Sequence, residues 1–227
     1  MRFQIYKMEL NTVIFDMDGL LIDSEPIWQD AATEVFKGYG LNLTQEQMNS
    51  TTGLRTHEYV KWWFAYYRIG DTESANAEKK IIRYMLENIE RKAKIMPGVP
   101  YIFDFFQKKN FKIGLASSSP QELIDLVTDL IGVTKFIQVS SSAEHLAYGK
   151  PHPLVYLDCA AKLGSDAYEC ICFEDSFNGM IAAKAARMKC VIVPHHTQMK
   201  EERWSAADLK LSSLQNFGEL HFNLVNG

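Results

Sequence analysis

The sequence has no long apolar run, no excess of basic residues and no framework of cysteines. No uninterrupted apolar stretch approaches the roughly 20 residues that a helix needs to cross a bilayer, and the N-terminus lacks the apolar segment of a signal peptide. We therefore expect a cytoplasmic protein that does not bind membranes. The 28 acidic residues outnumber the 24 basic ones, for a net charge of −4. That balance argues against a general nucleic-acid binder, which needs a basic surface.

The four cysteines all lie in the C-terminal third of the chain. They are too few for a disulfide framework in a protein of 227 residues. Cys170 and Cys172 are two residues apart in an apolar run, so on a strand they would point to one face. No other cysteine or histidine stands at a spacing typical of a zinc site. We expect buried, reduced thiols.

Short apolar runs alternate with helical patterns over most of the chain. The runs are continuous rather than alternating, which is typical of strands that are covered on both faces. They lie at 12–15, 112–116, 136–139, 170–173 and 190–193, with a weaker edge strand at 208–211. Helical spacing of apolar residues marks 98–109, 120–131, 152–163 and 177–187. This alternation predicts an α/β protein whose parallel sheet has helices on both sides.

One stretch of about 70 residues interrupts the alternation. It contains no convincing strand and is predicted to form helices near 26–38, 44–50, 55–68 and 73–93. We therefore expect two domains: a Rossmann-like core of residues 1–25 and 94–227, and a helical domain of residues 26–93 inserted after the first strand. Because Met8 stands just before that strand, residues 1–7 are a candidate extension.

Acidic side chains follow two of the predicted strands at their carboxyl ends. Asp16 and Asp18 follow the first strand, and Glu174 and Asp175 follow the fourth. Ligands of parallel α/β sheets bind at this edge, and neighbouring carboxylates repel each other unless a cation or a proton stabilises them. Because Mg²⁺ prefers oxygen ligands, Asp16, Asp18 and Asp175 make a plausible magnesium site with Glu174 beside them.

Two further segments supply groups that suit a phosphate. Ser117 and Ser118 follow the second strand and precede a predicted helix, where hydroxyl and N–H groups can bind an anion. Lys150 lies in a loop that is restricted by Pro151 and Pro153, so its ammonium group can be aimed inward as a point charge.

Taken together, four segments resemble the motifs of the haloacid dehalogenase superfamily, in the expected order. They are Asp-Met-Asp-Gly-Leu-Leu-Ile-Asp-Ser-Glu at 16–25, Leu-Ala-Ser-Ser-Ser-Pro at 115–120, Gly-Lys-Pro-His-Pro at 149–153 and Glu-Asp-Ser-Phe-Asn-Gly at 174–179. The helical insertion resembles the cap of the subgroup that contains beta-phosphoglucomutase and small sugar-phosphate phosphatases. The stretches 23–28 and 156–164 are similar to bacterial hexitol and 2-deoxyglucose-6-phosphate phosphatases.

The resemblance implies a Mg²⁺-dependent phosphatase that acts on small phosphorylated sugars or sugar alcohols. Asp16 would be the nucleophile that forms an aspartyl-phosphate, and Asp18 the general acid and base. Mg²⁺ would be held by the Asp16 carboxylate, the Asp18 backbone carbonyl and Asp175, with Glu174 alongside. Ser117, Ser118 and Lys150 would bind the phosphoryl oxygens.

The resemblance leaves alternatives open. A mutase of the beta-phosphoglucomutase type would have a histidine twelve residues after the nucleophile, and Trp28 stands there instead, which favours hydrolysis. A non-catalytic binding module would not need the intact motif set. Glu25, Trp28, Arg55 and Asn178 are the candidate substrate-binding residues. A monomer is the default expectation.

Overall fold

The computed structural model describes residues 9–227, so the expectation for residues 1–7 lies outside it. Six parallel strands form one sheet in the order β3-β2-β1-β4-β5-β6. Their bounds are β1 Thr12–Phe15, β2 Lys112–Ser117, β3 Val139–Ser142, β4 Cys170–Glu174, β5 Lys189–Ile192 and β6 Leu209–Lys210. The predicted α/β fold with a parallel sheet is confirmed. β1 lies between β2 and β4, so the residues that follow it reach the middle of the sheet edge.

Helices cover both faces of the sheet, and the two-residue period of β1 explains how. Val13 and Phe15 join one apolar cluster, whereas Ile14 joins another, because successive side chains of a strand point to opposite faces. The first face is covered by α5 (Val99–Lys108), α6 (Gln121–Leu130) and α9 (Glu219–Asn226), and the second by α7 (Leu154–Lys162) and α8 (Phe177–Ala185). All four cysteines are free and buried, as expected.

Aromatic packing holds the first face together. The ring of Phe15 on β1 lies 4.8 Å from that of Phe103 on α5 and 5.2 Å from that of Phe173 on β4. Each fully buried side chain of this size contributes about 1.5–3 kcal/mol. The strand ends that carry the acidic residues are therefore anchored in a rigid layer.

Two details of the predicted sheet domain were wrong. The third strand lies at Val139–Ser142 rather than at 136–139, and Thr134–Phe136 forms a single turn of 3-10 helix. The reason is that β3 is an edge strand with mostly half-exposed side chains, so serines serve there as well as apolar residues. Helix α9 near the C-terminus was not foreseen, although Phe222 and Val225 bury its inner face.

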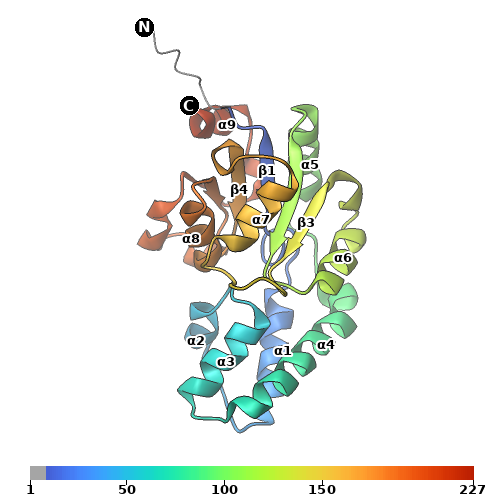
Figure 1. Cartoon of the computed structure of the whole chain (residues 1–227), viewed down its shortest axis with the longest axis vertical. Coiled ribbons are helices and arrows are strands. Elements are labelled where there is room, and N and C mark those ends of the chain that lie inside the picture. The colour runs from blue at the N-terminus through green and yellow to red at the C-terminus, as the bar shows by residue number, and fades with distance from the viewer. Residues whose placement is uncertain (1–8) are drawn as a thin grey trace, which may run out of the picture.

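Four helices form a group beyond the carboxyl ends of the strands (Figure 1). They are α1 (Glu25–Lys37), α2 (Gln45–Ser50), α3 (Thr56–Tyr66) and α4 (Ser74–Lys92). α4 buries Ala77, Ile81, Met85 and Ile89, a four-residue repeat that makes one apolar stripe. Two chain segments join this group to the sheet, and they are linked by the hydrogen bonds Asp23 N to Lys94 O, 2.8 Å, and Met96 N to Leu21 O, 3.0 Å.

Among residues 9–227, no helix is both long and apolar enough to cross a membrane.

Candidate active site

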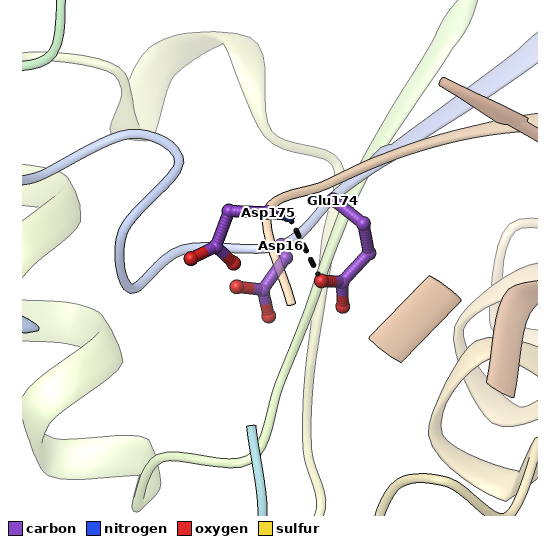
Figure 2. Close-up of side chains that lie close together, drawn as sticks. All are labelled: Asp16, Glu174 and Asp175. Carbon is purple, nitrogen blue, oxygen red and sulfur yellow. Dashed lines mark hydrogen bonds between the residues drawn. The ribbon is translucent and has the colours of Figure 1, made fainter. Parts of the chain in front are cut away.

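Three carboxylates meet where β1 and β4 end. Asp16 follows Phe15 directly, Glu174 is the last residue of β4, and Asp175 comes next. β1 and β4 are paired in parallel with Phe15 opposite Phe173, so their carboxyl ends are adjacent. One carboxylate oxygen from each of the three residues lies within 4.8 Å of the others, and Figure 2 shows the side chains gathered at this edge. Asp175 needs the space beside Gly19, because a Cβ there would overlap its carboxylate.

Lys150 is buried against this cluster. It is 2 % exposed, and its ammonium group donates to Asp16 Oδ1 at 2.5 Å and to Glu174 Oε1 at 2.6 Å. Charge-assisted hydrogen bonds of this kind are the strong ones in proteins. The fold thus brings the positive charge of Lys150 next to Asp16, which is far from it in the sequence. The prolines beside Lys150 suggested only that it points inward.

Glu174 makes more protein contacts than the sequence indicated. Its Oε1 also accepts from the Tyr156 hydroxyl at 2.7 Å, and its Oε2 accepts from the backbone N–H groups of Asp175 and Ser176 at 3.1 Å. Both oxygens are therefore engaged by protein. In this arrangement Glu174 holds Lys150 and shapes the loop after β4, and Tyr156, which no motif signalled, supports it.

The carboxylates of the cluster outnumber the positively charged groups beside them. Burial raises the pKa of Asp16 well above its usual value despite the opposing effect of Lys150, and Glu174 raises it further. Burial, followed by repulsion from Glu174 and Asp16, likewise raises the pKa of Asp175. Burial lowers the pKa of Lys150, but the two carboxylates outweigh it and keep the lysine charged. One lysine therefore faces three carboxylates, a donor set that suits an added cation.

Asp18 is held by three donors from outside the carboxylate cluster. Oδ1 accepts from the Ser24 hydroxyl at 2.6 Å and from the Trp28 indole N–H at 2.9 Å, and Oδ2 accepts from the Ser119 hydroxyl at 2.6 Å. Ser24 occupies the N-cap position of α1 but makes no capping bond, so its hydroxyl is committed to Asp18 instead. Sequence reasoning gave Ser24 no role, and it placed Ser119 in the serine cluster after the second strand without linking it to Asp18. Ser24 looks like an ordinary N-cap in the sequence, and only the structure shows that its hydroxyl binds Asp18 instead.

The two predicted phosphate-binding serines have different surroundings. Ser117, 1 % exposed, lines the cavity above Asp16, and its hydroxyl accepts from the backbone N–H of Ser119 at 3.0 Å. Ser118 also lines the cavity, but its hydroxyl donates to the backbone carbonyl of Gly53 at 2.7 Å. Ser118 therefore connects the sheet edge to the loop that precedes α3.

A cavity of about 100 Å³ lies over these residues. Strand-end residues form its floor, and α1, α3 and the loop 51–54 form the opposite wall. Of the predicted substrate-binding residues, Glu25 and Trp28 line this cavity. Arg55 and Asn178 do not. The guanidinium of Arg55 donates to the carbonyls of Ala143 and Leu146, and the amide of Asn178 donates to Thr52 O at 2.8 Å.

Comparisons with known proteins show the family of the chain. The model of the family described as haloacid dehalogenase-like hydrolase matches residues 13–193. The chain belongs to this family. It is 39 % identical over 207 residues to hexitol phosphatase B of Escherichia coli strain K12, covering 91 % of this chain and 93 % of the relative. The phosphorylated carbohydrates phosphatase of Thermotoga maritima is 30 % identical over 178 residues, covering 78 % of this chain and 82 % of the relative.

A solved structure shows the same fold. A beta-phosphoglucomutase from Clostridium difficile superposes with a TM-score of 0.84 at 22 % identity, covering 96 % of this chain and 97 % of the other. The predicted membership of the haloacid dehalogenase superfamily is confirmed, and so is the prediction of an enzyme of the phosphatase type, because the named relatives are phosphatases.

Proposed function

We propose that this protein is a Mg²⁺-dependent phosphatase that hydrolyses small phosphorylated sugars or sugar alcohols through an aspartyl-phosphate. The observation that carries the proposal is the placement of Asp16. Its carboxylate is buried at the floor of the cavity, 2.5 Å from the Lys150 ammonium and within 4.8 Å of Asp175 and Glu174, with Asp18 lining the same cavity. The named phosphatase relatives, one for hexitol phosphates and one for phosphorylated carbohydrates, support the substrate class.

The donor set fits a hard divalent cation. Asp16 and Asp175 offer carboxylate oxygens in a buried cluster with too little positive charge of its own. We expect Mg²⁺ to be held by Asp16, Asp175 and the backbone carbonyl of Asp18, with Glu174 alongside. When bound, the ion neutralises negative charge on the phosphoryl group and helps to orient it.

The residues divide the work of two successive displacements. Asp16 attacks phosphorus, and the bond between phosphorus and the ester oxygen breaks as Asp18 gives that oxygen a proton. Asp18 then takes a proton from water, which attacks the same phosphorus and releases phosphate and the free Asp16 carboxylate. Lys150 and Ser117 bind the phosphoryl oxygens throughout, because phosphoryl transfer depends mainly on positioning and charge stabilisation.

The helical group completes the site. We propose that residues 26–93 form a cap on a core of residues 1–25 and 94–227, and that the enzyme works as a monomer. The walls that α1 and α3 contribute to the cavity support this division, as do the bonds from Ser118 and Asn178 to the loop at Thr52 and Gly53. The mutase alternative is disfavoured, because Trp28 stands where the resemblance implies a histidine in a mutase.

A phosphate-release assay tests the proposal. The purified protein is incubated with sugar, polyol and nucleoside monophosphates, in Mg²⁺ or in EDTA, alongside the Asp16→Asn variant. We expect release from sugar or polyol phosphates only with Mg²⁺ and only from the wild type. Conversion of a sugar phosphate to its isomer without phosphate release would instead support the mutase. No release from any compound would contradict both and favour the binding module.

A further inference from the structure

The lining of the cavity differs in charge from a typical anion site. Four acidic residues line the cavity, namely Asp16, Asp18, Glu25 and Asp175. The only cationic side chain among the described lining residues is Lys150, and both of its hydrogen bonds already go to carboxylates at the strand ends. Once the reacting phosphate occupies that end, no positive side chain is left for a second anionic group of the substrate.

Glu25 adds a carboxylate to the cavity lining, close enough to the strand ends to raise the pKa of Asp175. It is the first residue of α1, and the described part of the chain gives its carboxylate no ion-pair or hydrogen-bond partner. Burial, together with the nearby charges of Asp18 and Asp23, raises the pKa of Glu25 to about 7. In its ionised form Glu25 would repel a carboxylate or a second phosphate of the substrate.

The other polar groups on the α1 and α3 side of the cavity are uncharged. Gln29 on α1, Thr52 in the loop before α3 and Thr56 on α3 line the cavity, and none of their side chains forms a hydrogen bond within residues 9–227. An amide and two hydroxyls can each donate and accept, which matches the hydroxyl groups of a sugar or polyol. A substrate without such hydroxyls would leave these groups unpaired, and unpaired polar groups are costly when water is displaced.

The arginine of the neighbouring groove does not supply the missing cation. This larger space, about 500 Å³, adjoins the cavity at Glu25 and Gln29 and contains Arg203. Arg203 is ion-paired with Glu201 at 2.5 Å and lies over the ring of Trp204. Its charge is therefore already compensated within the protein.

We propose that Glu25 and Gln29 determine specificity by admitting an uncharged, hydroxyl-bearing leaving group and rejecting a substrate that carries a second anionic group. The inference rests on the proposed phosphatase function and narrows its substrate class. Glu25 acts by repulsion and Gln29 by hydrogen bonding, and specificity devices commonly combine both.

A matched pair of substrates tests the repulsive part. Sorbitol 6-phosphate and 6-phosphogluconate share a six-carbon chain and a phosphate, and they differ in having a hydroxymethyl group or a carboxylate at the far end. We expect the wild type to prefer sorbitol 6-phosphate by at least about tenfold in kcat/KM, because like charges facing across a cavity repel strongly. Glu25→Gln should reduce that ratio about tenfold, mainly by improving the reaction of 6-phosphogluconate. Glu34→Gln changes an exposed residue of the same helix and should leave the ratio unchanged.

A second variant tests the hydrogen-bonding part. Gln29→Leu keeps the size of the side chain but removes its polar groups. It should lower kcat/KM for sorbitol 6-phosphate about tenfold and leave phenyl phosphate, which has no hydroxyl groups on its leaving group, nearly unaffected. Equal losses for both substrates would overturn the role of Gln29.

Binding measurements separate this inference from the proposed reaction. The Asp16→Asn variant is titrated with each compound by calorimetry, with and without the added Glu25→Gln change, so the ratio of Kd values is obtained without turnover. Tighter binding of sorbitol 6-phosphate that Glu25→Gln abolishes supports the inference even if neither compound is hydrolysed. Equal or tighter binding of 6-phosphogluconate to Asp16→Asn overturns it, even if the enzyme is a phosphatase.

Discussion

Glu25 offers a stability test that is independent of catalysis. Burial raises its pKa from 4.5 to about 7 in the folded protein, which means that ionisation opposes folding. The contribution of Glu25 to the free energy of unfolding is therefore fully present below pH 4.5 and is lost as the pH rises through 7. The difference between a pKa of 4.5 and one of about 7 corresponds to about 3 kcal/mol. Because Glu25 is partly open to the cavity, this is an upper bound.

Glu25→Gln removes the ionisation and should stabilise the protein in a pH-dependent way. The gain in free energy of unfolding should be below about 1 kcal/mol at pH 5 and approach about 3 kcal/mol at pH 8. Urea denaturation in EDTA measures it without interference from bound metal. Glu34→Gln on the outer face of α1 serves as the control and should show no such pH dependence. A gain for Glu25→Gln that is the same at both pH values would refute the raised pKa of this half-buried carboxyl.

Two substitutions probe the strand-end residues in other ways. Gly179→Ala would place a Cβ where the Glu174 carboxylate lies. We therefore expect kcat/KM to fall on the order of 100-fold and the melting temperature to drop. A fully active variant would contradict the packing of Glu174. Trp28→Phe keeps an aromatic ring but removes the indole N–H that lies 2.9 Å from Asp18. We expect kcat to fall roughly tenfold with little change in KM. The control Trp62→Phe, on the exposed surface, should have no effect.

The fold was predictable where burial dictates composition. β1, β2, β4 and β5 are continuous apolar runs because helices cover both of their faces, and their positions agree with the sequence to within one or two residues. β3 was misplaced because an edge strand has only one neighbour and tolerates serines. Helix α9 was missed because its short, mixed sequence carries little periodic signal.

The candidate site was predictable where chemistry follows a strand end. Asp16 and Asp175 could be predicted by local reasoning, because each is the first residue after a buried strand. Ser24 reaches Asp18, six residues before it, only because the loop after β1 turns back on itself, and Tyr156 reaches Glu174 from a helix that covers the sheet. Neither contact follows from a local sequence pattern. The direction of the Arg55 side chain depends on how the helical group meets the loop after β3, which is a tertiary property.

The central claim is that Asp16 carries the phosphoryl group during turnover. Acid quenching of the wild type while it hydrolyses sorbitol 6-phosphate in Mg²⁺, followed by mass mapping of peptides, tests this directly. The account predicts one phosphoryl group on Asp16, lost on mild alkaline treatment, and none on Asp18 or on the Asp16→Asn variant, which should release no phosphate. Rapid release of phosphate by Asp16→Asn, or a phosphoryl group found on a different residue, would contradict it.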